Sequence, residues 1–257
     1  MDVTSKKIKF KGKNGYMIAA QLDLPKTGKP KGMVLFAHCF TCSKNLNSVN
    51  YISKALVQKQ FGVFRFDFTG IGESEGDFSD TNFSTNIQDL VTAAEFMKKE
   101  YMAPDVLLGH SLGGAAVLAA ASSIPDIKAV ATIAAPFDPL HVSHHFQDQV
   151  CLIKKDGQAE VNLSGRKFII KKQFIEDIDS HNMVNHIKNL KVPLIIFHAP
   201  ADKTVGIENA KMIFDTARHP KSFVSLDKAD HLLLDNPKDG EYVGQVLASW
   251  VHRYLEA

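Results

Sequence analysis

The segment from Val106 to Ala120 constrains the fold of this chain more than any other. A short apolar run typical of a buried strand enters the pentapeptide Gly-His-Ser-Leu-Gly at 109–113, and alanine-rich residues typical of a helix follow at once. Ser111 therefore stands at a sharp strand-to-helix turn, the setting in which the pattern G-x-S-x-G is typical of a nucleophilic serine. The first turn of the helix also offers free N–H groups and the positive end of the helix dipole. Ser111 is the candidate nucleophile.

The same pattern occurs a second time, at Gly72–Gly76, with Ser74 in its centre. Ser74 lies several residues beyond the nearest expected strand, and the polar residues 77–80 follow it instead of a helix. A glutamate on each side would oppose formation of an alkoxide. We expect Ser74 to belong to a polar, glycine-rich loop.

Apolar runs and helical patterns alternate along most of the chain. Strands are expected at 33–37, 62–66, 106–110, 129–134, 193–197 and 222–226, and helices at 48–60, 85–100, 208–217 and 240–254. Residues 6–11 and 16–24 indicate a hairpin at one sheet edge. This alternation predicts an α/β fold, with a mostly parallel central sheet and helices on both faces.

The alternation of strand and helix patterns is interrupted between residues 137 and 190. A helical stretch at 138–150, a hairpin of 159–163 with 166–170, and a helix at 174–190 are expected there. An insertion of this size after a central strand is more typical of a cap over a site than of the sheet itself. We therefore divide the chain into a core, residues 1–136 and 191–257, and an inserted helix-hairpin-helix cap, residues 137–190. Its apolar side chains favour an apolar acyl or aryl group in the substrate; among them are Phe146, Phe168, Phe174 and Met183.

A serine nucleophile needs a base within hydrogen-bond reach and an acid that orients the base. These partners are expected after the serine, in the order acid and then histidine, on loops that leave strands. Asp202 and His231 stand at those places, with Asp227 and Asp235 as alternative acids. Two further histidines at strand ends, 110 and 198, are expected to be structural, and the first should point away from the site.

Acyl transfer also needs two N–H donors directed at the developing oxyanion. We expect one from the backbone of Leu112 and the other from the loop after residues 33–37, where Phe40 is preferred and Cys39 is the reserve.

Cys39 and Cys42 form a C-x-x-C, which elsewhere marks a redox pair or half of a zinc site. We expect free thiols here, with redox sensitivity as the alternative, because three cysteines are too few and odd in number for a disulfide framework. The histidines at 141, 144 and 145 could bind a metal on one helix face, but a solvated or lid-facing helix is preferred. We expect no metal and no cofactor.

The chain has 257 residues, 45% of them hydrophobic and 23% charged, with a formal charge of +2. The dispersed charge gives no basic stripe of the kind that nucleic-acid binding needs. No signal peptide is apparent at the N-terminus, and no apolar run approaches the roughly 18 residues of a membrane span. These features predict a cytoplasmic protein with neither nucleic acid nor membrane as a partner; the candidate serine site points to a small-molecule ester substrate. The oligomeric state is left open, a homodimer included.

Four stretches carry a resemblance to a known family: 36–45, 65–76, 109–114 and 230–233. In combination they resemble the α/β-hydrolases, particularly bacterial serine hydrolases that occur alone or fused to an OsmC-type domain, and capped cinnamoyl and feruloyl esterases. Those esterases commonly have His-Gly-Phe where this chain has His38-Cys39-Phe40. The resemblance implies a serine carboxylesterase acting on small to medium esters. A peptidase or thioesterase of the same fold, or a catalytically silent binding protein, is the alternative.

Overall fold

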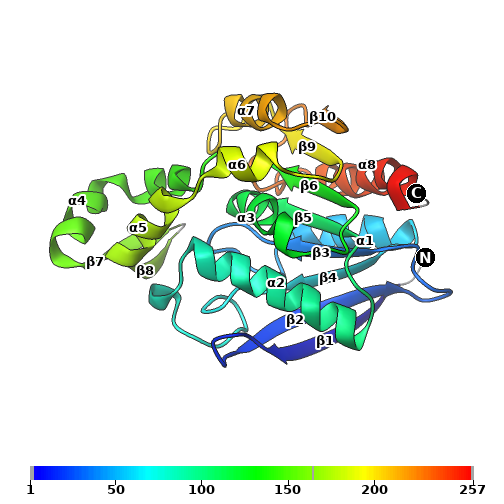
Figure 1. The fold of residues 1–257 in the computed structure, drawn as a ribbon, viewed down its shortest axis with the longest axis horizontal. Helices are drawn as coiled ribbons and strands as arrows, with labels where there is room; N and C mark the ends of the chain where they lie inside the picture. Colours follow the sequence, from blue (N-terminus) through cyan, green and yellow to red (C-terminus); the bar gives the residue numbers. More distant parts are fainter. Residues whose placement is uncertain (1–2, 164, 256–257) are drawn as a thin grey trace.

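The computed structural model describes residues 3–163 and 165–255. An eight-stranded sheet in the order β1-β2-β4-β3-β5-β6-β9-β10 runs through its centre (Figure 1). β1 and β2 form an antiparallel hairpin, β2 is antiparallel to β4, and all other neighbouring strands are parallel, so the predicted edge hairpin and mostly parallel sheet are confirmed. The strands are β1 (Val3–Lys11), β2 (Met17–Pro25), β3 (Met33–Ala37), β4 (Gly62–Phe66), β5 (Val106–His110), β6 (Ala129–Ile133), β9 (Leu194–His198) and β10 (Lys221–Ser225).

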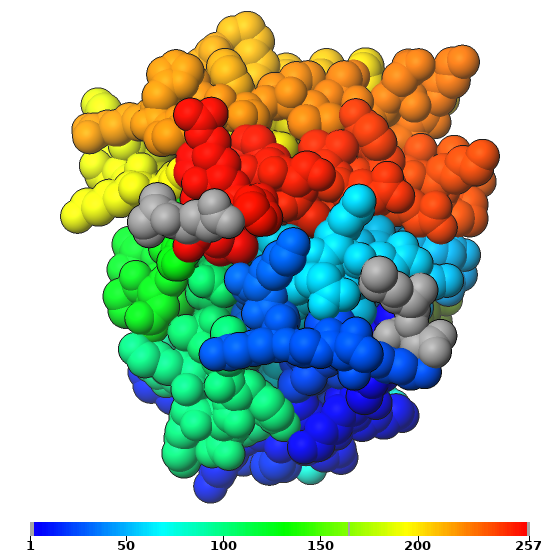
Figure 2. Space-filling model, turned by 90° about the vertical axis from the view of Figure 1, so that its right-hand side faces the viewer, coloured from blue at the N-terminus to red at the C-terminus, as the bar shows by residue number. Residues whose placement is uncertain are grey.

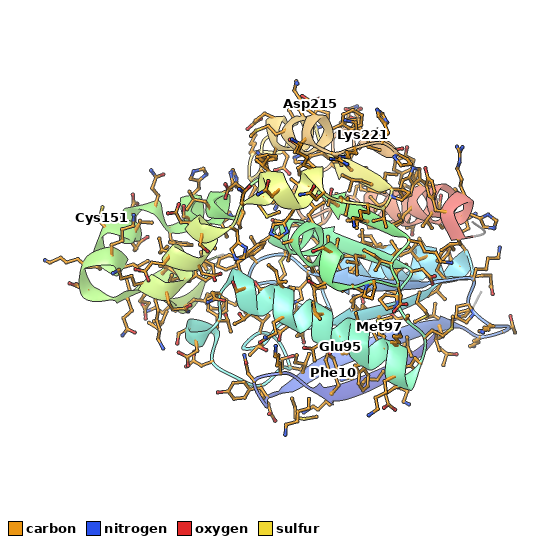
Figure 3. The ribbon with its side chains drawn as sticks, in the orientation of Figure 1. Phe10, Glu95, Met97, Cys151, Asp215 and Lys221 are labelled. Atoms are coloured by element: carbon orange, nitrogen blue, oxygen red, sulfur yellow. A yellow bond between two sulfur atoms is a disulfide. The ribbon has the colours of Figure 1, made fainter. Side chains whose placement is uncertain are left out.

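Helices cover both faces of this sheet because successive side chains of a strand point to opposite sides. α1 (Asn47–Gln58) and α8 (Pro237–Leu255) share one apolar cluster with Val34 and Phe36 of β3. Figure 2 shows the side of the molecule on which α8 lies against α1. α2 (Phe83–Glu100), α3 (Leu112–Ala120) and α7 (Glu208–Thr216) contribute to the other cluster, to which Leu35 belongs. Phe10 of β1 and Met97 of α2 also lie in that second cluster (Figure 3).

An insertion follows β6 and projects beyond one end of the sheet (Figure 1). Its elements are the 3₁₀ helix η3 (Pro139–Phe146), α4 (Gln147–Asp156), the hairpin β7 (Gln158–Leu163) with β8 (Arg166–Lys171), α5 (Lys172–Ser180) and α6 (Met183–Lys188). The single helix predicted at 174–190 is wrong: the chain leaves the helix at His181. The side chain of Asn182 then accepts a hydrogen bond from the N–H of Asn185 and begins a second helix.

Six strands, β3, β4, β5, β6, β9 and β10, run in parallel, so their carboxyl ends meet at one edge of the sheet. The loops that leave these ends are where ligands bind in open α/β sheets. The insertion departs from the same edge, after β6. Within residues 3–163 and 165–255, no helix has both the length and the apolar character needed to cross a bilayer.

Candidate active site

Ser111 follows β5 directly and adopts a left-handed backbone conformation, with φ 54° and ψ −125°. Such a conformation costs a non-glycine residue roughly 1–3 kcal/mol and persists only where the surroundings hold it. The Ser111 N–H donates to the carbonyl of Ile133 (2.8 Å), and the Ser111 carbonyl accepts from the N–H of Gly114 (2.7 Å). A Cβ at Gly113 would lie 2.4 and 2.5 Å from the carbonyl oxygens of His38 and Ala37. Only glycine lets the helix start this close to the end of β3.

His231 connects Ser111 to Asp202. Its Nδ1–H donates to Oδ2 of Asp202 (2.7 Å), and its Nε2 accepts from Oγ of Ser111 (3.0 Å). The carboxylate of Asp230 accepts from the N–H groups of Leu234 and of the residues at 232 and 235, which fixes the loop that carries His231. The structure thus places the three predicted residues in one hydrogen-bonded chain, each on a loop leaving a different strand.

Asp202 is held in place by its own loop. Its Oδ1 accepts from the N–H groups of Thr204 (2.8 Å) and Val205 (3.0 Å). Burial acts to raise the pKa of Asp202, but the hydrogen bonds from His231 and from these two backbone groups outweigh it, so the pKa lies below its usual value. The carboxylate therefore stays ionised beside the imidazole. Because Nδ1 of His231 bonds to Asp202, the alternative acids at 227 and 235 do not occupy this position.

Two buried histidines outside this chain contact its loops. His110 does not point away from the site as expected: its Nε2–H donates to the backbone carbonyl of His231 (2.7 Å). Burial, followed by the nearby charge of His231, lowers the pKa of His110 to about 4. His198 donates from Nε2 to the carbonyl of Val205 (2.7 Å), and its pKa is lowered mainly by burial. Both rings are therefore neutral near pH 7, and each holds one loop of the site.

The loop after β3 makes a tight turn in which the N–H of Cys42 donates to the carbonyl of Cys39 (3.1 Å). Thr41 lies inside the turn with φ 58°. The prediction of free thiols is wrong, because Cys39 and Cys42 form a disulfide. The turn brings their Cα atoms to 5.2 Å, within the range that a disulfide spans. Phe40, the preferred source of an oxyanion donor, lies within the short loop that this disulfide closes.

This turn, residues 39–42, is fixed on both sides. Before it, Nδ1–H of His38 donates to the carbonyl of Cys39 (2.8 Å), and Nε2 of His38 accepts from the N–H of Phe68 (3.2 Å). After it, the buried Lys44 ammonium bonds to Asp67 Oδ2 (2.7 Å), and the Lys44 N–H bonds to Oδ1 (2.7 Å). Phe40 and the first residue of α3 line one small cavity, so the two expected donors border the same space.

Ser74, the second match to the serine pattern, has a structural setting. Its Oγ donates to the carbonyl of Asp67 (2.6 Å) and accepts from the N–H of Ala19 (2.8 Å). These bonds tie the loop after β4 to β2. The expectation of a polar loop agrees with this arrangement.

The insertion reaches the site at several points. His141 donates from Nε2 to the carbonyl of Thr204 (2.8 Å), and the guanidinium of Arg166 donates to the carbonyl of Thr41. The His141 ring lies 4.6 Å from that of His144. In the part of the chain that the structure describes, no group of three or more His, Cys, Asp or Glu side chains is arranged to hold a metal ion.

Four side chains were expected to make the insertion apolar toward a substrate. Phe146, Phe174 and Met183 are buried, with the Phe174 ring 5.6 Å from that of Phe40 in the core, and Phe168 is half-buried. His145 and Asn162 line a cavity between the insertion and the turn at 39–42. The sequence analysis considered His145 only as a metal ligand or as part of a solvated or lid-facing helix, and it did not single out Asn162. No sequence pattern distinguishes these two from other polar residues on the surface.

Comparisons with known proteins identify the family of the chain. A family model described as "Serine aminopeptidase, S33" matches residues 28–155. The crystal structure of the esterase domain of a Rhodothermus marinus protein is 47% identical, with a TM-score of 0.80 over 99% of this chain and 100% of that one. The chain belongs to the α/β-hydrolase family. The predicted fold class is confirmed. The relatives found include esterases, which is consistent with an ester hydrolase.

Two more distant α/β-hydrolases extend the comparison. Est1E from Butyrivibrio proteoclasticus, solved with ferulic acid bound, shares the fold with a TM-score of 0.79 at 18% identity, over 97% of this chain and 100% of that one. The mouse mitochondrial palmitoyl-protein thioesterase ABHD10 is 24% identical over 219 residues, which is 79% of this chain and 70% of that protein.

Proposed function

We propose that this α/β-hydrolase is a serine carboxylesterase that hydrolyses small to medium carboxylic esters through an acyl-enzyme intermediate. The observation that carries the proposal is the hydrogen-bonded chain from Asp202 through His231 to Ser111, at 2.7 and 3.0 Å. A serine hydroxyl becomes an effective nucleophile when such a base accepts its proton.

In the proposed mechanism, Oγ of Ser111 attacks the ester carbonyl carbon while its proton moves to Nε2 of His231. The N–H groups of Leu112 and Phe40 bind the oxyanion, and ionised Asp202 stabilises the imidazolium. His231 then returns the proton to the departing alcohol, and an acyl-serine remains. A water molecule, deprotonated by His231, attacks the acyl carbon, and the carboxylic acid leaves as Ser111 regains its proton. None of these steps requires a metal or a cofactor.

We further propose that the insertion, residues 137–190, acts as a cap on the core formed by 1–136 and 191–257. Its contacts with the turn at 39–42 and with the loop of Asp202 support this role, since a substrate must pass between the insertion and the sheet edge.

The test compares hydrolysis of p-nitrophenyl acetate and butyrate by the wild type, Ser111→Ala and Ser74→Ala. We expect Ser111→Ala to lose activity by roughly 10⁴-fold or more and Ser74→Ala to remain active. Activity that survives in Ser111→Ala and vanishes in Ser74→Ala would exclude Ser111 as the nucleophile. A fluorophosphonate probe that fails to label Ser111 would favour a catalytically silent binding protein.

A peptidase or thioesterase is the second candidate, favoured by the "Serine aminopeptidase, S33" match and by the thioesterase among the relatives. Both reactions use the same chemistry on another acyl bond. Faster turnover of an aminoacyl anilide or an acyl thioester than of the matching ester would favour it.

A further inference from the structure

Two cavities border the candidate site, and Phe40 lines both. The inner cavity encloses about 20 Å³, and its wall includes Phe40, Phe68, Ile71, Phe78, Leu112 and Ala116. The outer cavity encloses about 120 Å³ between the turn at 39–42 and the insertion, and its wall includes His145 and Asn162. The turn at 39–42 therefore borders two cavities of different size, and both Phe40 and Thr41 line each of them.

The inner cavity lies where the acyl group of a bound ester would extend. Its wall includes Leu112 and Phe40, whose N–H groups are the candidate oxyanion donors, so the carbonyl group of a bound ester lies beside this cavity. The apolar side chains of the wall suit acyl carbons better than an alcohol with further hydroxyl groups. A cavity of about 10–15 Å³ holds one water molecule, so the inner cavity of about 20 Å³ admits a group of one or two carbons.

An aromatic wall keeps this inner cavity small. The ring of Phe40 lies 5.7 Å from that of Phe78 and 5.6 Å from that of Phe174, which is buried on α5. Phe78 in turn packs edge-on against Phe168 of β8 at 4.8 Å. Because these rings join the core to the insertion, the cavity cannot widen unless the packing between the two parts changes.

The outer cavity lies between the turn at 39–42 and the insertion, and His145 is part of its wall. Partial burial, followed by the nearby charge of His231, lowers the pKa of His145, which keeps its ring neutral near pH 7. Phe40 lines both cavities, so an ester whose carbonyl oxygen accepts from the Phe40 N–H has its acyl carbons at the inner cavity and its alcohol at the outer one. A neutral imidazole and the amide of Asn162 both donate and accept hydrogen bonds, as alcohol hydroxyl groups do.

We propose that Phe40 restricts the acyl group to acetyl or propionyl size, and that His145 and Asn162 bind an alcohol that carries further hydroxyl groups. The proposal rests on the esterase function proposed above. It names a substrate class, short-chain acyl esters of polyols or sugars, and a specificity-determining residue.

The first experiment measures kcat/KM for p-nitrophenyl acetate, butyrate and octanoate. In the wild type we expect kcat/KM for the acetate ester to exceed that for the octanoate ester by about tenfold or more. The additional methylene groups of the octanoyl chain find no room in the small inner cavity. Phe40→Ala keeps the backbone N–H and removes the ring, so the acetate-to-octanoate ratio should fall by about tenfold. Phe223→Ala, which removes an exposed aromatic ring from β10, is the matched control and should leave the ratio unchanged.

The second experiment compares glycerol monoacetate with ethyl acetate. His145→Ala and Asn162→Leu should each lower the ratio of kcat/KM for the two esters by about three- to tenfold, the effect of one hydrogen bond. His144→Ala, a neighbour on η3 that does not line the outer cavity, should leave the ratio unchanged.

A wild type that prefers octanoate, or a Phe40→Ala variant with an unchanged ratio, would overturn the acyl part of the proposal. Unchanged ratios in both His145→Ala and Asn162→Leu would overturn the alcohol part. In either case, acetate hydrolysis that depends on Ser111 would leave the esterase function standing, whereas no hydrolysis of any ester would refute that function itself.

Discussion

Replacement of Asp89 by asparagine should stabilise the protein near neutral pH. Asp89 lies on α2 with 3% of its surface exposed, and its carboxylate accepts from the N–H (2.8 Å) and the Oγ1–H (3.0 Å) of Thr69. Burial raises the pKa of Asp89 to about 6, and the bonds from Thr69 offset this only in part. At pH 7 the folded protein therefore holds an ionised carboxylate whose burial lowers the free energy of unfolding.

The size of the effect follows from the pKa. The pKa of about 6 lies roughly 2 units above the ordinary value of 3.8, and each unit corresponds to about 1.4 kcal/mol, so ionised Asp89 costs the folded state about 3 kcal/mol at pH 7. The raised pKa means that the folded state binds the proton more tightly than the unfolded state. Asp89 therefore lowers the free energy of unfolding least below pH 4, and this loss of stability grows as the pH rises from 4 to above 6.

Asparagine can replace both hydrogen bonds, since its Oδ1 accepts from the Thr69 N–H and its amide donates to Oγ1. We expect Asp89→Asn to raise the free energy of unfolding by roughly 1–3 kcal/mol at pH 7, and this advantage to shrink by about 2 kcal/mol on going to pH 4. Urea unfolding at pH 7, 5.5 and 4 measures both. Glu95→Gln removes an exposed carboxylate from the same helix and is the matched control (Figure 3). If the free energy of unfolding of Asp89→Asn exceeds that of the wild type by the same amount at pH 7 and pH 4, the reasoning is refuted.

Three further predictions concern the loops of the site. His110→Phe removes the donor to the carbonyl of His231 and should lower kcat by about tenfold with little change in KM, whereas His110→Gln restores the donor and should recover most of the rate; equal rates for the two variants would contradict this role. Gly113→Ala should cost about 1–3 kcal/mol in urea unfolding and lower kcat, because the new methyl group displaces the end of β3; an unchanged unfolding midpoint would contradict it. Replacing Cys39 and Cys42 together by serine should cost about 2 kcal/mol, a small value because the closed loop is short. Cys151→Ser, at an exposed free cysteine on α4, is its control (Figure 3), and equal midpoints for the two would refute a stabilising disulfide.

The sheet could be predicted because its central strands are buried on both faces and therefore appear as continuous apolar runs. The candidate site followed from the same fact. Once the strands are parallel, the residues after their carboxyl ends share one edge, and Ser111, Asp202 and His231 each stand there. The pairing of the two cysteines could not be predicted, because it depends on a turn in which Thr41 adopts a positive φ. A pattern of hydrophobicity does not report that conformation.

The direction of His110 was missed for a related reason. A residue beside the nucleophile should point away if the turn is considered alone, but the loop of His231 folds across the same strand end and presents a carbonyl to the ring. The contact joins residues 121 positions apart, and only the assembled sheet brings them together. The break in the helix at His181 is the opposite case, since Asn182 is a local capping residue that the apolar spacing of 174–190 concealed.

The insertion makes hydrogen bonds to two loops of the candidate site and to the start of α2. His141 contacts the loop that carries Asp202, Arg166 contacts the turn that carries Phe40, and Asn82 at the start of α2 bonds to Gln173 of α5 (2.6 Å). If the insertion is the proposed cap, it cannot move away from the core without breaking these contacts, two of which involve the loop of the proposed acid and the turn of the proposed oxyanion donor. Substrates should therefore enter through the outer cavity beside His145, with the cap in place. If the insertion acts as the proposed cap, substitutions at these contacts should change kcat as well as KM for ester hydrolysis.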